Sequence, residues 1–126
     1  MKILKKLSKF WRCYGPGSVG SIARTMTKTY TEFSRKFPNK SKRDLIILTL
    51  ESRYPLKNRT MNIVGQSLPA SAEFILDEYG DSLHNAIMIV LSVEHPEISQ
   101  VSVDTTSEIS RMIDEIISKY APTAVD

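Results

Sequence analysis

Hydrophobic and basic positions recur at a helical period near the start of the chain. Between residues 2 and 14 the apolar side chains fall on one arc of a helix, and the basic side chains fall on the opposite arc. The apolar arc includes Leu4, Leu7, Phe10, Trp11 and Tyr14. The pattern predicts a basic amphipathic helix over residues 1–14. Helices this short are marginal in water, so its apolar face needs a surface to lie against.

A second helical pattern extends from residue 18 to residue 36. Its opposite face carries Arg24, Lys28 and Arg35, and Pro38 with Asn39 marks its end. The apolar stripe recurs at spacings of three and four residues and consists of Val19, Ile22, Met26, Tyr30, Phe33 and Phe37. This regular stripe predicts an amphipathic helix that buries one face.

Two further runs are apolar without a polar face, LIILTL at residues 45–50 and MIVLSV at residues 88–93. Periodicity alone does not separate a buried helix from a buried strand. Ser41 and Asp44 resemble a capping box and favour a helix for the first run. Asp81 or Ser82 is expected to cap a helix over the second run, ending near His95. We expect that helix to be the centre of the core.

The remaining segments are shorter. Residues 55–68 are expected to be a connection with an extended piece at Met61–Val64, and Pro69 to lie in the first turn of a helix that stops at Gly80. Residues 97–104 alternate weakly and predict one short strand.

The last helix of the chain has a clear apolar face between Ile109 and Tyr120. Its N-cap is expected at one of three hydroxyl residues, Thr105, Thr106 or Ser107.

These elements predict an all-α fold, a compact bundle of five to six helices preceded by the basic amphipathic helix. The expected organisation is the helix over residues 1–14, a Gly-rich hinge at residues 15–20 and a single helical domain at residues 21–126. The alternative is an α+β fold with two or three short strands, formed by LIILTL, MIVLSV and QVSV.

The uneven distribution of charge along the chain is the most informative feature of its composition. Residues 1–60 contain 15 Lys and Arg and three acidic residues, a net charge of +12. Residues 61–126 contain two Lys and Arg and 11 acidic residues, a net charge of −9. The two halves sum to the net charge of +3. Such asymmetry indicates an anionic partner for the basic half, or attraction between the halves within one chain or between chains.

The basic half contains a candidate anion-binding or nucleic-acid-binding stretch at residues 24–43. Its members are Arg24, Lys28, Arg35, Lys36, Lys40, Lys42 and Arg43. They could follow a phosphate backbone, but the sequence shows no recognition helix, zinc finger or RNP-like motif for reading bases. The expected binding is therefore independent of base sequence.

The stretch CYGPGSVG at residues 13–20 has the G-x-G-x-x-G spacing of a dinucleotide loop. That site requires a buried strand before the glycines, whereas a basic amphipathic helix is predicted there. We expect a hinge between helices. A weaker hypothesis is a phosphate site formed by the backbone amides of Gly17, Ser18, Val19 and Gly20.

Chemical groups for catalysis or metal binding are sparse. Cys13 is the single cysteine, which excludes an intramolecular disulfide and suits a reducing compartment. No apolar run is long enough to span a bilayer as a helix. We therefore expect a cytoplasmic protein. His84 and His95 would lie about 16 Å apart along one helix and could not share an ion. With no nucleophile motif, we expect no enzyme, cofactor, metal or small-molecule substrate.

The sequence thus predicts a small non-enzymatic interaction module that binds itself or another protein. Nonspecific nucleic-acid binding through residues 24–43 is one alternative. Peripheral attachment to an anionic membrane surface through residues 1–14 is the other.

Overall fold

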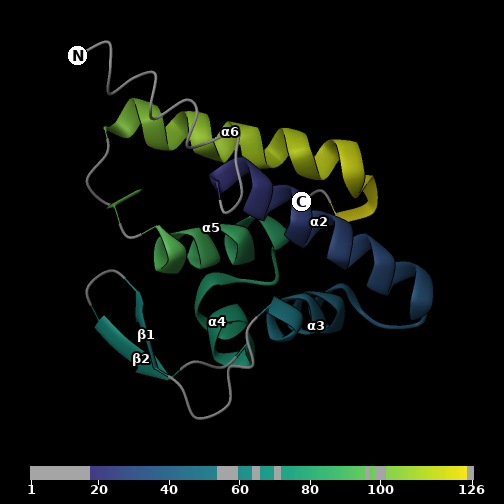
Figure 1. Cartoon of the computed structure of the whole chain (residues 1–126). Coiled ribbons are helices and arrows are strands. Elements are labelled where there is room, and N and C mark those ends of the chain that lie inside the picture. The colour runs from purple at the N-terminus through teal and green to yellow at the C-terminus, as the bar shows by residue number, and fades with distance from the viewer. Residues whose placement is uncertain are drawn as a thin grey trace.

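The computed structural model of the protein describes residues 18–53, 60–63, 66–69, 72–95, 97–98 and 102–124. The all-α prediction is confirmed, because five helices make up most of these residues (Figure 1). They are α2 (Val19–Lys36), α3 (Lys42–Arg53), α4 (Ala72–Tyr79), α5 (Leu83–Glu94) and α6 (Val103–Tyr120), followed by a 3-10 turn, η2 (Pro122–Ala124). In Figure 1, α6 and α2 lie above α5, and α4 and α3 lie below it.

The two apolar runs are helices, so the α+β alternative is wrong for both. LIILTL lies in α3 and MIVLSV lies in α5. The helix α5 packs against all four of the other helices, with Leu83, Ile87 and Leu91 fully buried. Apart from the exposed Glu94, the residues of α5 are buried or half-buried, which agrees with the absence of a long polar stripe in its sequence.

The longest helices, α2 and α6, each bury the stripe that the sequence predicts. They pack against each other, and Ile22, Met26, Ile109 and Ile113 are at most 2% exposed. Phe37, the last residue of the predicted α2 stripe, lies just after the helix and is 37% exposed.

A small β-hairpin connects α3 to α4. Its strands β1 (Thr60–Ile63) and β2 (Gln66–Pro69) pair antiparallel, with Thr60 opposite Pro69 and Ile63 opposite Gln66. The extended piece expected at Met61–Val64 overlaps β1. The prediction that Pro69 opens a helix is wrong, because Pro69 ends β2 and α4 begins at Ala72. Proline is tolerated both at strand ends and in first helical turns, so its presence did not separate the two.

Serine hydroxyls bond the first turn of four helices; before α3, the hydroxyl of Ser41 accepts from the amide of Asp44 at 3.1 Å, as the sequence predicts. Ser18, Ser82 and Ser102 have extended backbone angles, and each hydroxyl accepts a hydrogen bond from the amide three residues later, at 3.1, 3.2 and 3.1 Å. Ser82 is therefore the cap of α5, and Asp81 is not. Ser102 replaces the expected caps at residues 105–107.

The strand expected at residues 97–104 is wrong at the positions that the structure describes, and residues 99–101 lie outside them. Val103 and Asp104 form the first turn of α6, while Glu97 and Ile98 belong to a short helical turn after α5. Val103 is 81% exposed, so the weak alternation there does not reflect a buried strand face. The hydroxyl of Ser102 caps α6, which begins at the next residue.

Candidate functional site

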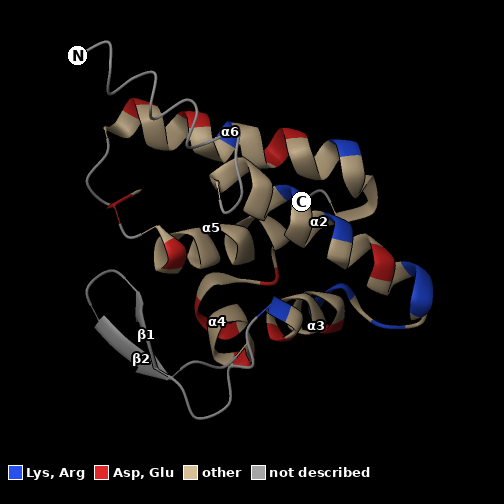
Figure 2. Ribbon diagram, in the orientation of Figure 1, with Lys and Arg blue, Asp and Glu red and all other residues tan. Residues whose placement is uncertain are grey.

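The most exposed basic cluster is at the turn between α2 and α3, here called the basic turn and defined as Arg35, Lys36 and Lys40. Figure 2 shows the blue side of α2 continuing into this connection. All three residues are exposed, and among the described residues none of them makes an ion pair. Arg35 and Lys36 occupy the last turn of α2, where the helix dipole stabilises positive charge. The basic turn is thus a local positive surface with no ion pair among the described residues.

The other four residues of the predicted anion-binding stretch are placed differently. Lys28 lies with its Nζ 5.1 Å from the ring centroid of Tyr120 in α6. Arg24 and Lys42 are half-buried and already contact other groups of the protein. The structure therefore brings only part of the seven-residue stretch to an open surface.

Arg43, the last of the seven, is held by two carboxylates of the acidic half. Its guanidinium donates to Oδ1 of Asp77 and to Oδ1 of Asp81, each at 2.6 Å. The hydrogen bond to Asp77 and then that to Asp81 raise the pKa of Arg43 from its usual value, so the guanidinium stays charged. This contact joins the first turn of α3 to the end of α4 and accounts for Asp81, which the sequence assigned as a helix cap.

A second ion pair joins the two halves between α3 and α5. Nε and Nη2 of Arg53 contact the two carboxylate oxygens of Glu94 at 2.8 and 3.0 Å. The side chains are 23% and 27% exposed. Together with Arg43, this pair shows that part of the charge asymmetry is satisfied within one chain.

Phe37 places an aromatic ring within the basic turn. Phe33 stacks on it with ring centroids 6.3 Å apart, and Nζ of Lys40 lies 5.6 Å from its centroid. The ring is therefore engaged with neighbours of its own chain. Its remaining exposed fraction of 37% adds apolar area to an otherwise basic surface.

The phosphate-loop residues are buried where the structure describes them. Ser18, Val19 and Gly20 are all buried, and the hydroxyl of Ser18 is used as the cap of α2. Val19 and Gly20 belong to the first turn of α2, so the helix begins inside the predicted hinge at residues 15–20. Burial of these residues weighs against an open phosphate loop. Gly17 lies outside the described residues.

The predicted interface of the N-terminal helix also lies outside the described residues. This applies to Leu4, Leu7, Phe10, Trp11 and Tyr14, and to the single cysteine, Cys13. Docking of residues 1–14 on the domain, on a partner or on a membrane therefore stays a prediction.

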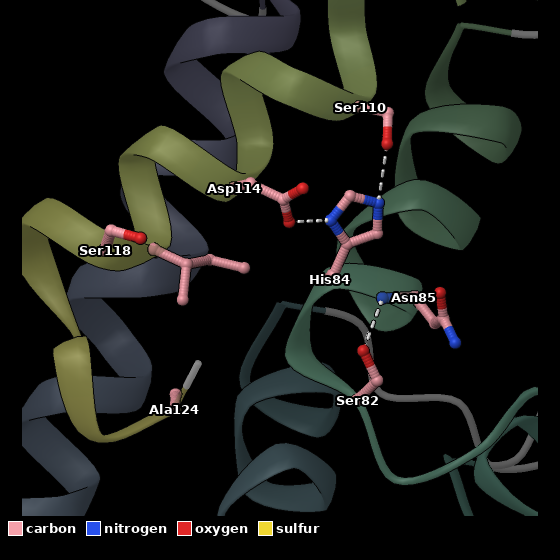
Figure 3. A pocket seen from close by; sticks show the side chains of 8 residues that line it. Ser82, His84, Asn85, Ser110, Asp114, Ser118 and Ala124 are labelled. Carbon is pink, nitrogen blue, oxygen red and sulfur yellow. Dashed lines mark hydrogen bonds and ion pairs between the residues drawn. The ribbon is translucent and has the colours of Figure 1, made fainter. Parts of the chain in front are cut away.

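His84 forms a hydrogen-bonded cluster with two residues of α6, as Figure 3 shows. Its Nδ1 lies 2.6 Å from Oδ1 of Asp114, and its Nε2 lies 3.2 Å from Oγ of Ser110. The other histidine, His95, contacts Glu97 instead, at 3.1 Å. Among the described residues no three His, Cys, Asp or Glu side chains gather in a group suited to a metal ion.

The His84 cluster lies on the wall of an open hollow of about 500 Å³. The hollow is formed by the start of α5, the C-terminal half of α6 and the turn η2; beyond the cluster its lining is Ser82, Asn85, Ile117, Ser118 and Ala124. Polar side chains predominate in this lining, and Ile117 and Ala124 supply the apolar contacts. The volume falls in the range of small-molecule sites.

Sequence reasoning considered His84 only with residues close to it in the chain and missed Ser110 and Asp114. One signal was present, because Ser110 and Asp114 are four residues apart and so lie one turn apart on the same side of α6. What the sequence did not provide was the packing that places the start of α5 beside that side of α6. Ser110 and Asp114 are 26 and 30 residues from His84.

A scan of known protein families, a search of curated proteins and a search of solved structures each find no match to this chain. Within the described helices, none combines the length and apolarity needed to cross a bilayer. The site residues themselves are therefore the basis for the function proposed next.

Proposed function

We propose that the protein is a small helical interaction module that docks its basic turn on an acidic protein surface, either of a second copy or of another protein. The observation that carries the proposal is the exposure of Arg35, Lys36 and Lys40 without an ion pair among the described residues. Elsewhere the fold pairs basic residues with its own acids, as at Arg43 and Arg53. A partner that supplies carboxylates would extend the same chemistry between chains.

The basic turn fits a protein surface better than a nucleic-acid backbone. A nucleic-acid binder gains affinity from many phosphate contacts along a track. Here the track is interrupted, since Arg43 is paired with Asp77 and Asp81 and Lys28 lies over Tyr120. Phe37, the aromatic residue of the turn, is already stacked on Phe33, which leaves it poorly available for stacking on bases.

A second copy of the chain offers exposed carboxylates on two of its helices. Glu73 and Glu78 are exposed on α4, and Asp104 and Glu115 are exposed on α6. Opposite charges on separate faces of one molecule favour association between copies, and such association weakens as salt screens the charges. Self-association is therefore the first form of the proposal to test.

The test measures molar mass by light scattering coupled to size exclusion, at tens of micromolar protein and at about 50 mM and about 500 mM salt. The full chain is compared with the double variant Arg35→Gln/Lys36→Gln. The matched control is Arg111→Gln/Lys119→Gln, which removes the same amount of positive charge from exposed positions of α6. We expect an oligomer at low salt that dissociates at high salt and in the first variant, while the control resembles the unaltered chain.

Other results assign the basic turn differently. A monomer at both salt concentrations overturns self-association. If an added single-stranded oligonucleotide then binds in a salt-dependent way and the Arg35→Gln/Lys36→Gln variant loses that binding, nucleic acid replaces protein as the partner. Equal behaviour of the variant and the control overturns any role for the basic turn.

The predicted N-terminal helix is tested in the same assay by the full chain carrying Leu7→Asp. Loss of the oligomer in this variant would assign assembly to the apolar face of residues 1–14. If the protein is monomeric but binds vesicles containing anionic lipid, and Leu7→Asp abolishes that binding, membrane attachment is the function of this helix.

A further inference from the structure

The two hydrogen-bond partners of His84, Asp114 and Ser110, determine which ring nitrogen carries the proton. A carboxylate only accepts hydrogen bonds, so Nδ1 of His84 carries the proton that it shares with Asp114 at 2.6 Å. In the neutral imidazole Nε2 is then an acceptor, and Ser110 donates its hydroxyl proton to it across 3.2 Å. The result is a nucleophile, a base and a group that orients the base.

The fold supplies this arrangement from rigid elements. Ser110 and Asp114 project from adjacent turns of α6, and His84 is the second residue of α5, two positions after the cap Ser82. Packing of α5 against α6 fixes the distance between them. Sites built on helices hold their geometry better than sites built on loops.

The cluster is accessible to a small molecule. Ser110, His84 and Asp114 all line the hollow of about 500 Å³, and Ser110 is half-buried. The side chain of His84 is 19% exposed, so its ring is largely enclosed, whereas that of Asp114 is 66% exposed.

We propose that Ser110, His84 and Asp114 form an acyl-transfer site that hydrolyses small carboxylic esters. This activity goes beyond the docking function and concerns a different face of the molecule from the basic turn. Oγ of Ser110 attacks the carbonyl carbon while its proton moves to Nε2 of His84. The C–O bond to the leaving alcohol then breaks, and the alkoxide takes the proton from Nε2, which leaves the acyl group on Ser110.

Water completes the reaction. His84 removes a proton from a water molecule as the water oxygen attacks the acyl-serine carbonyl. The bond to Oγ breaks, Oγ recovers the proton from Nε2, and the carboxylic acid is released. Ser82 and Asn85, at the positive N-terminal end of α5, line the same hollow, and this end of the helix would favour the negative charge of the oxyanion that forms in each half-reaction.

Asp114 is a positioning residue in this scheme. It fixes the imidazole tautomer and stabilises the imidazolium that forms during transfer. Because its side chain is 66% exposed, solvent screens its charge, and its contribution is expected to be smaller than that of His84.

The test treats the full chain with a fluorophosphonate probe and locates the adduct by mass spectrometry. In this reaction a bond forms between Oγ and phosphorus, the P–F bond breaks, fluoride leaves, and the serine proton passes to Nε2. We expect the adduct on Ser110, no adduct at that position in Ser110→Ala, and at least about a 100-fold slower reaction in His84→Gln. Ser118→Ala is the matched control, because Ser118 lines the same hollow without contacting His84 in the described cluster.

A pH profile separates catalysis from a structural role of the same residues. The pH dependence of the labelling rate should change in His84→Gln if His84 acts as the base. Asp114→Asn should slow labelling by about tenfold, with partial recovery in Asp114→Glu. Far-UV circular dichroism confirms that each variant is folded.

Three outcomes overturn the proposal. The first is no adduct on Ser110 in the folded, unaltered chain. The second is an adduct distributed over several exposed serines. The third is an adduct on Ser110 whose rate is the same in a folded His84→Gln variant. Hydrolysis of a small aryl ester that follows the same order of variants would extend the result from labelling to turnover.

Discussion

The hydroxyl of Thr31 in α2 donates to the backbone carbonyl of Tyr120 in the last turn of α6, at 2.8 Å. The last carbonyl groups of a helix have no partner within it, so this hydroxyl satisfies one of them from a neighbouring helix. Oγ1 also lies 3.0 Å from the carbonyl of Thr27 and shares its proton between the two acceptors. The contact fixes the end of α6 against the middle of α2.

Replacing Thr31 by valine should lower the free energy of unfolding by about 1 kcal/mol, because the valine keeps the shape but leaves the Tyr120 carbonyl without this donor. Thr31→Ser keeps the hydroxyl and is the matched control. Urea unfolding followed by far-UV circular dichroism measures both. A valine variant as stable as the serine variant would show that water replaces the lost donor at no cost.

Gly80 ends α4 in a backbone conformation that favours glycine. Its φ angle is +93°, and an added Cβ would meet nothing closer than Nδ2 of Asn85, at 4.0 Å. Gly80→Ala should therefore cost about 1 to 2 kcal/mol through backbone strain alone. Gly80→Asn should cost less, because asparagine tolerates positive φ better than alanine does. Thermal unfolding measures the stability of both variants. An equal loss of stability in Gly80→Ala and Gly80→Asn would refute this prediction.

Helix positions were predictable from this sequence where one face is buried and the other is solvated. The stripes of α2 and α6 have that form, and their buried residues are the predicted ones, such as Ile22 and Ile113. Their boundaries were less predictable when several residues could act as a cap. Four hydroxyl residues lie between positions 102 and 107, and the first of them, Ser102, is the cap of α6.

Contacts between helices were not predictable, because they depend on which faces meet. The charge split indicated attraction between the halves, and the Arg43 and Arg53 pairs provide it. The sequence did not identify their partners, which lie 34 to 41 residues away. The His84 cluster required the same missing information, the packing of α5 on α6.

The Arg53 and Glu94 pair should show measurable coupling in a double-mutant cycle of Arg53→Gln and Glu94→Gln. The pair has two parallel hydrogen bonds, and its side chains are only 23% and 27% exposed. We therefore expect a coupling free energy of about 1 kcal/mol, at the upper end of the range for surface ion pairs. The cycle is read from urea unfolding of the four proteins. Coupling should fall between about 50 mM and about 500 mM salt. Coupling indistinguishable from zero at low salt would mean that desolvation cancels the attraction.

Arg43 should stabilise the fold by an amount that depends on salt but not on pH in the neutral to alkaline range. Its hydrogen bonds to Asp77 and Asp81 raise its pKa. A group whose pKa is raised on folding contributes fully below its unfolded pKa, and for arginine that limit lies above about pH 12. The loss of stability in Arg43→Gln should therefore be the same at about pH 7 and about pH 10, and smaller at high salt. Arg35→Gln, which removes an exposed charge that has no ion pair among the described residues, is the control and should change stability little. A loss in Arg43→Gln no greater than that in Arg35→Gln would mean that the two carboxylates do not join α3 to α4 energetically.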